Sequence, residues 1–187
     1  MKVENFKTND GWREALTAAR LTANKPPIDK EPSDTFKRKM LKAEHSPIRL
    51  VEFTWVWQGI KSWVATHFVR HHIGIEKFVA TQRQDRTDNP IPRDEIEQGA
   101  LVDVMIRANA QAMINISRKR LCNKASSETS VAWRAVLTEL RKADEQTYNV
   151  CVPECVYRGF CPEAESCGYC KTKEFENKLR EYRDGTK

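Results

Sequence analysis

Long hydrophobic runs are missing from this 187-residue chain, whereas a helix that spans a bilayer needs about 18–20 apolar residues in succession. The opening segment, MKVENFKTNDGW, also lacks the apolar core of a secretion signal. We therefore expect a cytoplasmic protein without a membrane partner. Thiols usually stay reduced in that compartment, so the six cysteines are not expected to form disulfides.

Blocks of one charge, internal repeats and low-complexity tracts are absent as well. The 32 Lys and Arg residues exceed the 26 Asp and Glu residues and give a formal charge of +6. This balance favours anionic partners such as nucleotides or phosphorylated cofactors. Because the basic residues are dispersed, nucleic acid is not an expected partner. Since 40% of the residues are hydrophobic, the chain can bury the core of one domain with a small appendage.

The apolar periodicity predicts a mixed α/β (α+β) chain. Helical spacing follows the capping residues Asn9 and Asp10, and it follows Ser33 and Asp34 in the same way. A run rich in Val, Phe, Thr and Trp predicts a strand at 50–57. Helices are predicted at 10–22, 34–44, 63–71, 94–119 and 126–144; residues 78–84 fit a strand or an extended segment, and the charged tail at 171–187 fits a helix.

The stretch VRHHIGIEKFVATQRQD contains two adjacent histidines and several basic residues. On a helix, His67, Arg70 and His71 would share one face. Arginine suits bidentate recognition of phosphate, and histidine can donate a hydrogen bond to an anion. A solvated helix end that complements the helix dipole is the plainer interpretation. His67 and His71 have the spacing of a metal pair, but no HExxH motif accompanies them.

Five of the six cysteines fall in the segment CVPECVYRGFCPEAESCGYC. The C-x-x-C pair at its end, together with the upstream thiols, could form a tetrahedral thiolate site. Structural zinc is the leading interpretation, with an iron–sulfur cluster or free thiols as alternatives. Cys122 is expected to stand apart from them and to be buried. The expected metal ligands are Cys151, Cys155, Cys161, Cys167 and Cys170.

Polar residues interrupt the apolar pattern of the segment NAQAMINISRKR. Asn109, Asn115, Arg118 and Arg120 would need hydrogen-bond partners if they were buried there. A ligand could supply those partners, and so could the neighbouring backbone. The pattern alone leaves both possibilities open.

Taken in order, several segments resemble motifs of the flavin-dependent thymidylate synthases (ThyX). AARLT at 18–22 resembles the family's AARvS, and HSPIRLVEFTW at 45–55 resembles its H-x-S/T-P-x-E-H…F-T-F. HFVRHH at 67–72 resembles its Q-x-x-R-H-R, and TQR at 81–83 resembles its S-x-R. NAQAMINISRKR followed by ASSE resembles its N-A-R-S-L-x-N-F-L-x-L-R…A-Q-x-E. The resemblance covers about residues 10–165.

The resemblance implies a central sheet flanked by helices, with the Cys-rich C-terminal segment as a small addition. It implies methylation of dUMP at C5 with carbon from methylenetetrahydrofolate and hydride from reduced FAD, which NADPH reduces. It also implies a homotetramer with flavin sites between subunits. We expect a catalytic domain over 1–148, with a Cys-rich segment and charged tail over 149–187 packed on it.

The resemblance also implies roles for individual residues. Arg120 is expected to be the cation beside the pyrimidine, and Arg70 shares the catalytic role. The other expected substrate-binding residues are His67, Thr81 and Arg83. The expected cofactor-binding residues are Thr22, Arg70, His71, His72, Asn109 and Asn115.

Several positions depart from the family pattern. His72 and Gln111 stand where the family has arginines, and Arg49-Leu50 replaces its Glu-His pair. The segment from 73 to 83 is one residue longer, and the segment from 83 to 109 is much shorter. These differences leave two alternatives open. One is methyl or hydroxymethyl transfer to another pyrimidine nucleotide such as dCMP. The other is a catalytically decayed, zinc-stabilised module that binds a nucleotide or nucleic acid.

Overall fold

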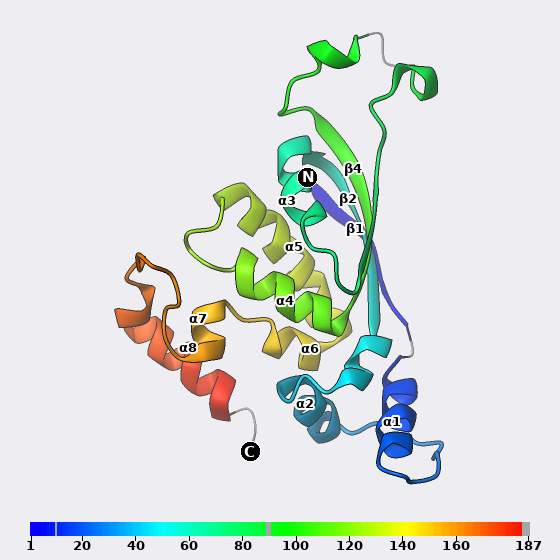
Figure 1. Ribbon diagram of the computed structural model, residues 1–187, viewed down its shortest axis with the longest axis vertical. Helices are drawn as coiled ribbons and strands as arrows, with labels where there is room; N and C mark the ends of the chain where they lie inside the picture. Colours follow the sequence, from blue (N-terminus) through cyan, green and yellow to red (C-terminus); the bar gives the residue numbers. More distant parts are fainter. Residues whose placement is uncertain (10, 89–90, 185–187) are drawn as a thin grey trace.

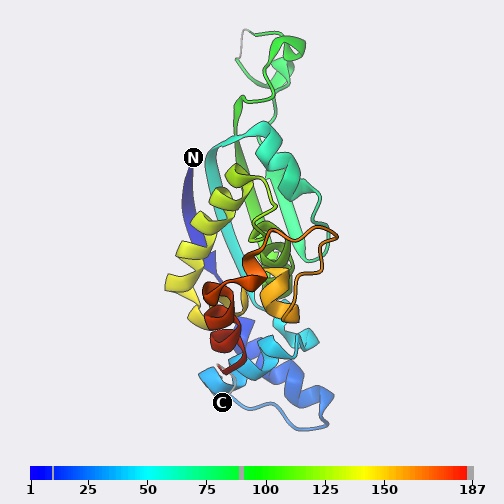
Figure 2. The same cartoon turned by 90° about the vertical axis from the view of Figure 1, so that its left-hand side faces the viewer.

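A four-stranded antiparallel sheet forms the centre of the computed structural model, which describes residues 1–9, 11–88 and 91–184. Its strand order is β1-β2-β4-β3. Helices cover one face of this sheet, as Figures 1 and 2 show from two directions. The expected α/β fold with a central sheet and flanking helices is therefore confirmed. The strands are β1 (Lys2–Thr8), β2 (Glu52–Lys61), β3 (Ile75–Val79) and β4 (Leu101–Asn109).

The two inner strands carry the core because their side chains alternate between the two faces. In β2, Phe53, Trp55 and Trp57 are fully buried. Trp55 pairs across the sheet with Ile106 of β4, which is also fully buried. Trp133 from a covering helix meets Trp55 with ring centroids 6.1 Å apart. The sheet and the helical layer are thus joined by large aromatic side chains.

The expected helix over 94–119 is wrong in its first half. Residues 101–109 form β4, whose side chains are alternately exposed and buried. The inward positions Val102, Val104, Ile106 and Ala108 follow the period of two that a half-buried strand requires. The helix begins only at Ala110, where the Asn109 side chain accepts a hydrogen bond from the Ala112 amide at 2.9 Å.

The other predicted helices are confirmed with small shifts of their ends. Ser33 caps its helix by accepting a hydrogen bond from the Phe36 amide at 3.3 Å. Asp10, the second expected cap, lies outside the described residues. The edge strand β1 was not predicted from the sequence. The helices are α1 (Gly11–Thr22), α2 (Asp34–Lys42), α3 (Ser62–Val69), α4 (Ala110–Arg120), α5 (Ser127–Ala143), α6 (Glu145–Val150), α7 (Glu154–Arg158) and α8 (Lys173–Asp184), with short 3-10 turns at Ser46–Leu50, Gln84–Arg86, Arg93–Glu95 and Tyr169–Lys171.

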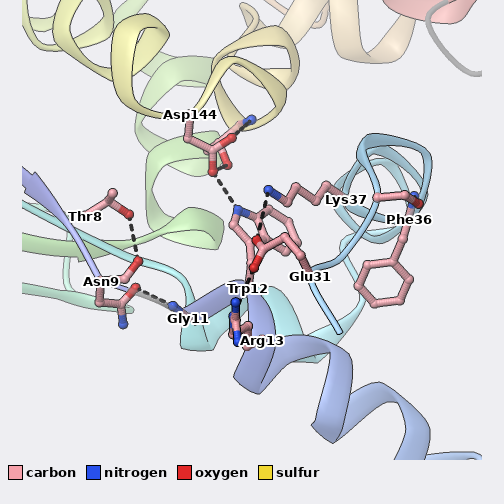
Figure 3. Close-up of polar contacts among 11 residues, drawn as sticks. Thr8, Asn9, Gly11, Trp12, Arg13, Glu31, Phe36, Lys37 and Asp144 are labelled. Atoms are coloured by element: carbon pink, nitrogen blue, oxygen red, sulfur yellow. Dashed lines mark hydrogen bonds and ion pairs between the residues drawn. The ribbon is translucent and has the colours of Figure 1, made fainter. Parts of the chain in front are cut away.

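The start of α1 is fixed to both halves of the chain (Figure 3). The Trp12 indole donates to the Asp144 carboxylate at 2.7 Å, across 132 residues of sequence. Asp144 also accepts a hydrogen bond from the Thr147 amide at 3.0 Å and so caps α6. Asn9 accepts hydrogen bonds from the amides of Gly11 and Glu52 at 3.1 and 2.9 Å. These contacts hold the first helix against the sheet and the C-terminal helices.

A second, small hydrophobic cluster lies among the C-terminal elements. It consists of Val152, Val156 and Phe175, against which Tyr182 packs. Tyr182 also packs on the main core, and the Lys42 ammonium lies 3.4 Å from its ring centroid. The Cys-rich segment therefore rests on the body of the protein. The division at residue 148 remains a prediction.

No helix within the described ranges combines the length and the apolar character that a membrane span needs.

Candidate functional site

The end of α3, the turn that follows it and the end of α4 come together around Arg120. The Arg120 Nε donates to the His71 Nε2 at 3.1 Å, and a second guanidinium nitrogen donates to the His67 carbonyl. Burial lowers the pKa of Arg120, and the nearby charge of Arg70 lowers it further. The exposed guanidinium of Arg70 thus stands near the partly buried guanidinium of Arg120, a pairing that favours an anion beside them.

His71 is neutral in this arrangement. Burial lowers its pKa to about 4, and the charges of Arg120, Lys77 and His72 act in the same direction. A neutral imidazole that accepts a hydrogen bond at Nε2 carries its proton on Nδ1. Lys77 donates to the His71 carbonyl and so fixes the backbone on the other side of the residue. His71 therefore orients Arg120 without adding a positive charge.

Arg70 lies between two open hollows of the surface. The first, about 450 Å³, lies over α3 and is lined by Trp63, His67 and Arg70 among others. The second, about 300 Å³, is lined by Arg70, His71, His72 and Asn115 together with apolar residues of α4. None of the described residues that line either hollow is acidic. Both hollows are thus suited to ligands with negative charge.

The expectation that His67, Arg70 and His71 share a helix face is wrong for His71. The helix ends at Val69, Arg70 caps it, and His71 follows in the turn. The His67 Nδ1 lies 2.7 Å from the hydroxyl of Thr129, which is fully buried. His67 is held by α5, whereas His71 faces Arg120. Sequence reasoning missed Thr129, because a buried threonine carries no signal of its own.

Asn109 has a structural task at the edge of this site. Its side chain caps α4 and presses against Gly74, where φ is 71°. A Cβ atom on Gly74 would lie 2.6 Å from the Asn109 amide atoms. The cap and the glycine together hold the turn between α3 and β3 against the start of α4.

Gln111, which stands where the family has an arginine, belongs to a polar network around Glu44. Gln111 donates to the Glu44 carboxylate at 2.6 Å and to the Asn115 carbonyl oxygen at 3.4 Å. Arg118 pairs with Glu44, and its guanidinium lies 3.5 Å from the ring centroid of Tyr157. Burial opposes ionisation of Glu44, but the hydrogen bonds from Arg118 and Gln111 outweigh it and lower the pKa of Glu44. Gln111 therefore links Asn115 to the C-terminal segment.

Thr22, Thr81 and Arg83 lie away from this site, and, like Asn109 and Arg120, they line neither hollow. Thr22 is exposed at the end of α1, where its hydroxyl donates to the Ala19 carbonyl at 3.0 Å. Thr81 and Arg83 belong to the connection between β3 and β4, which projects beyond the sheet in Figure 1. Arg83 pairs with Asp85 at 2.6 Å. A single chain does not bring these residues to Arg120.

The cysteines are distributed differently from the expectation. Cys151 is buried in the main core, where its thiol hydrogen-bonds with Ser117 and burial raises its pKa to about 12. Cys151 is absent from the lining of the pocket that the other thiols share. Cys122, expected to stand apart and buried, is partly exposed and lies with them instead. One pocket is lined by Cys122, Cys155, Cys161, Cys167 and Cys170.

The chain shares its fold with flavin-dependent thymidylate synthases. No protein-family model matches the sequence, and no curated protein matches it either. Helicobacter pylori ThyX complexed with FAD and dUMP superposes with a TM-score of 0.64 at 12% identity, over 81% of this chain and 100% of that one. A second structure of that enzyme with FAD and dUMP gives 0.62 at 13% identity, over 81% and 99%. PolB, a UMP/dUMP methylase from Streptomyces cacaoi bound with 5-Br dUMP, gives 0.61 at 13% identity, over 85% and 95%.

Proposed function

We propose that this protein is a ThyX-like nucleotide methyltransferase that methylates dUMP at C5 with methylenetetrahydrofolate and reduced FAD. The observation that carries the proposal is the pair of neighbouring cations Arg70 and Arg120, of which Arg70 lines two hollows without acidic residues. The shared fold supports it, because the H. pylori structures were solved with FAD and dUMP. NADPH is the proposed reductant of the flavin.

The residues fit two anionic, phosphorylated ligands. Arg70 lines both hollows and can contact a ligand in either. His72 and Asn115 add a hydrogen-bonding ring and an amide to the smaller hollow, which we assign to the flavin. His67 and Trp63 line the larger one, which we assign to the nucleotide. When bound, a reduced flavin supplies the hydride of the reaction.

Arg120 is the proposed catalytic cation. Its guanidinium has five N–H donors, of which the protein engages those directed at the His71 ring and the His67 carbonyl. The remaining donors can stabilise negative charge as it develops on the pyrimidine ring. Because neutral His71 holds Arg120 from the side, the cation needs no rearrangement during the reaction. Arg70 lies close enough to strengthen the positive field.

A homotetramer is part of the proposal. Thr22, Thr81 and Arg83 lie outside the hollows of their own chain. A site between subunits would let these residues act on the hollow of a neighbour. The projecting connection that carries Thr81 and Arg83 has the position for such a reach (Figure 1).

Another pyrimidine nucleotide is the second candidate substrate. The similarity to a UMP/dUMP methylase favours a site that accepts more than one such nucleotide. Gln111 and His72, which replace arginines of the family motif, border the smaller hollow or contact its lining. Transfer of a hydroxymethyl group to dCMP belongs to the same class of reaction.

Anaerobic incubation tests these possibilities directly. The purified protein is mixed with reduced FAD, methylenetetrahydrofolate and one of dUMP, UMP or dCMP, and the products are identified by mass spectrometry. We expect dUMP to gain the mass of one CH2 unit, because a methyl group replaces the hydrogen at C5. If only dCMP gives a product, dCMP replaces dUMP as the proposed substrate. If the protein binds no flavin and modifies none of the three nucleotides, the proposal is refuted. The alternative of a catalytically decayed binding module would then remain.

Arg120→Ala tests the role of the cation. We expect turnover to fall by about 10²–10³-fold, as for the loss of other preorganised charge donors, with flavin binding retained. Lys119→Ala is the matched control, because Lys119 is the adjacent basic residue and is exposed. The readouts are single-turnover rate and flavin fluorescence. Loss of the flavin in Arg120→Ala would show that Arg120 is a cofactor ligand.

A further inference from the structure

The pocket lined by five cysteines, here called the cysteine pocket, has no part in the proposed reaction. Its volume is about 20 Å³, and roughly 10–15 Å³ is enough to admit one water molecule. It lies where the chain beyond α4 meets α7 and the turn before α8. Cys122 comes from the segment after α4, Cys155 from α7, and the other three from the loop between α7 and α8. Thiols distant in the sequence thus converge on a space for a single ion.

The thiols contact one another within the pocket. Cys170 is in hydrogen-bonding contact with Cys155 on one side and with Cys161 on the other. Cys122 stands on the Cys155 side, close enough to interact electrostatically with it. Cys167 is exposed and lies at the rim. The pocket therefore has three thiols in contact and a fourth adjacent to them from a different part of the chain.

The backbone around the pocket is shaped to present these thiols. Gly168 adopts φ 83° between Cys167 and Cys170, a conformation that glycine reaches without strain. The Lys171 amide donates to the Gly168 carbonyl at 2.9 Å and closes this turn. Gly159, at φ 84°, ends α7 by donating its amide to the Cys155 carbonyl at 2.8 Å. Both turns lie in the stretch of chain that supplies four of the five cysteines lining the pocket.

We propose that the cysteine pocket binds one structural zinc ion through the thiolates of Cys122, Cys155, Cys161 and Cys170. Zinc bound at about 2.3 Å by four sulfurs places them about 3.8 Å apart, close to the spacing of thiols in contact. Each thiol that binds the ion releases one proton to solvent. Within the described ranges no group of three or more His, Cys, Asp or Glu side chains already has the arrangement of a metal site, so the proposal requires the thiols to move together as the ion binds.

A single zinc ion suits the pocket better than an iron–sulfur cluster. Thiolate ligands select both, but a cluster of several iron and sulfur atoms exceeds a space of about 20 Å³. The ion would join the C-terminal segment to the residue that lies two positions after Arg120. The inference does not depend on the proposed reaction, because it rests on the thiols alone.

Elemental analysis of the full-length purified protein tests the proposal. We expect one zinc per chain, and stoichiometry near zero for Cys122→Ser, Cys155→Ser, Cys161→Ser and Cys170→Ser. Cys151→Ala is the control and keeps its zinc, since Cys151 lies in the main core. Circular dichroism verifies that each variant is folded. In the cobalt-substituted protein, visible absorption of a tetrahedral four-thiolate site is expected.

Two kinds of result would overturn the proposal. Six freely reactive thiols without metal, or iron with charge-transfer absorption, would exclude a zinc site in this pocket. Full zinc content in Cys122→Ser with loss in Cys167→Ser would refute the ligand set, because it would confine the ion to the Cys-rich segment. As a second measurement, a mercurial reagent titrated against the native protein should release the zinc as the four ligand thiols react, after the exposed Cys167 has reacted.

Discussion

The neutral state of His71 predicts a specific dependence of stability on pH. Its pKa is about 4 in the folded protein and 6.5 when unperturbed. Between these values the unfolded chain binds a proton that the folded chain excludes. The stabilising contribution is therefore fully present above pH 6.5 and is lost as the pH falls toward 4. Replacement by a neutral side chain should remove this part of the pH dependence.

The expected magnitude follows from the same two values. The full difference between 6.5 and about 4 corresponds to about 3.4 kcal/mol of unfolding free energy. Because His71 is only partly buried, solvent screening reduces this to about 1–2 kcal/mol. His71→Gln is the suitable variant, since its side-chain oxygen can still accept the hydrogen bond from Arg120. Between pH 7 and pH 4.5, we expect the free energy of unfolding to fall by about 1–2 kcal/mol less in the variant than in the parent.

Urea unfolding followed by tryptophan fluorescence at several pH values measures this difference. His72→Gln is the matched control, because it also removes an imidazole but keeps the contact between His71 and Arg120. A direct check is the titration of the His71 ring by NMR. Parallel pH curves for His71→Gln and the parent, or a measured pKa between 6 and 7, would refute the argument that burial and neighbouring cations keep His71 neutral.

Two further substitutions test the packing of the fold. Trp12→Phe should lower the free energy of unfolding by about 1.5–3 kcal/mol in urea titrations, because it removes the 2.7 Å hydrogen bond to the Asp144 carboxylate; an unchanged midpoint would show that this contact is not formed in solution. Gly74→Ala should cost about 1–3 kcal/mol, since it strains a positive φ and places a Cβ atom against Asn109. Gly99→Ala, which meets open space, should stay within about 0.5 kcal/mol, and equal effects of the two glycine variants would contradict this account.

Local sequence patterns predicted those helices and strands whose burial follows from the spacing of their own residues. The aromatic and β-branched run of β2 and the helices α1, α2 and α5 follow from residues that are neighbours in sequence. β4 was mistaken for helix because small and apolar residues fill both periods in that segment, and only pairing with β2 decides between them. β1 is an edge strand with a largely exposed, polar sequence, so its pairing with β2 is its main determinant.

The candidate site was predictable in part for the same reason. The family motifs identified Arg70, His71 and Arg120, which the fold brings together. Their hydrogen bonds join segments 49 residues apart and depend on the geometry of the whole sheet. Cys122 was set aside because it is distant in sequence from the other thiols that line its pocket. Residues that are far apart along the chain can be neighbours in the folded protein, so sequence distance did not predict which thiols line one pocket.

The hydrogen bond between Trp12 and Asp144 also cannot form until most of the chain has been synthesised. At about 5–20 residues per second, the ribosome needs about 7–26 s to add the 132 residues that separate them. Until then the first helix has emerged without its final anchor, and the cap of α6 does not yet exist. The first helix therefore gains its contact with Asp144 only late in synthesis, after most of the chain has been made.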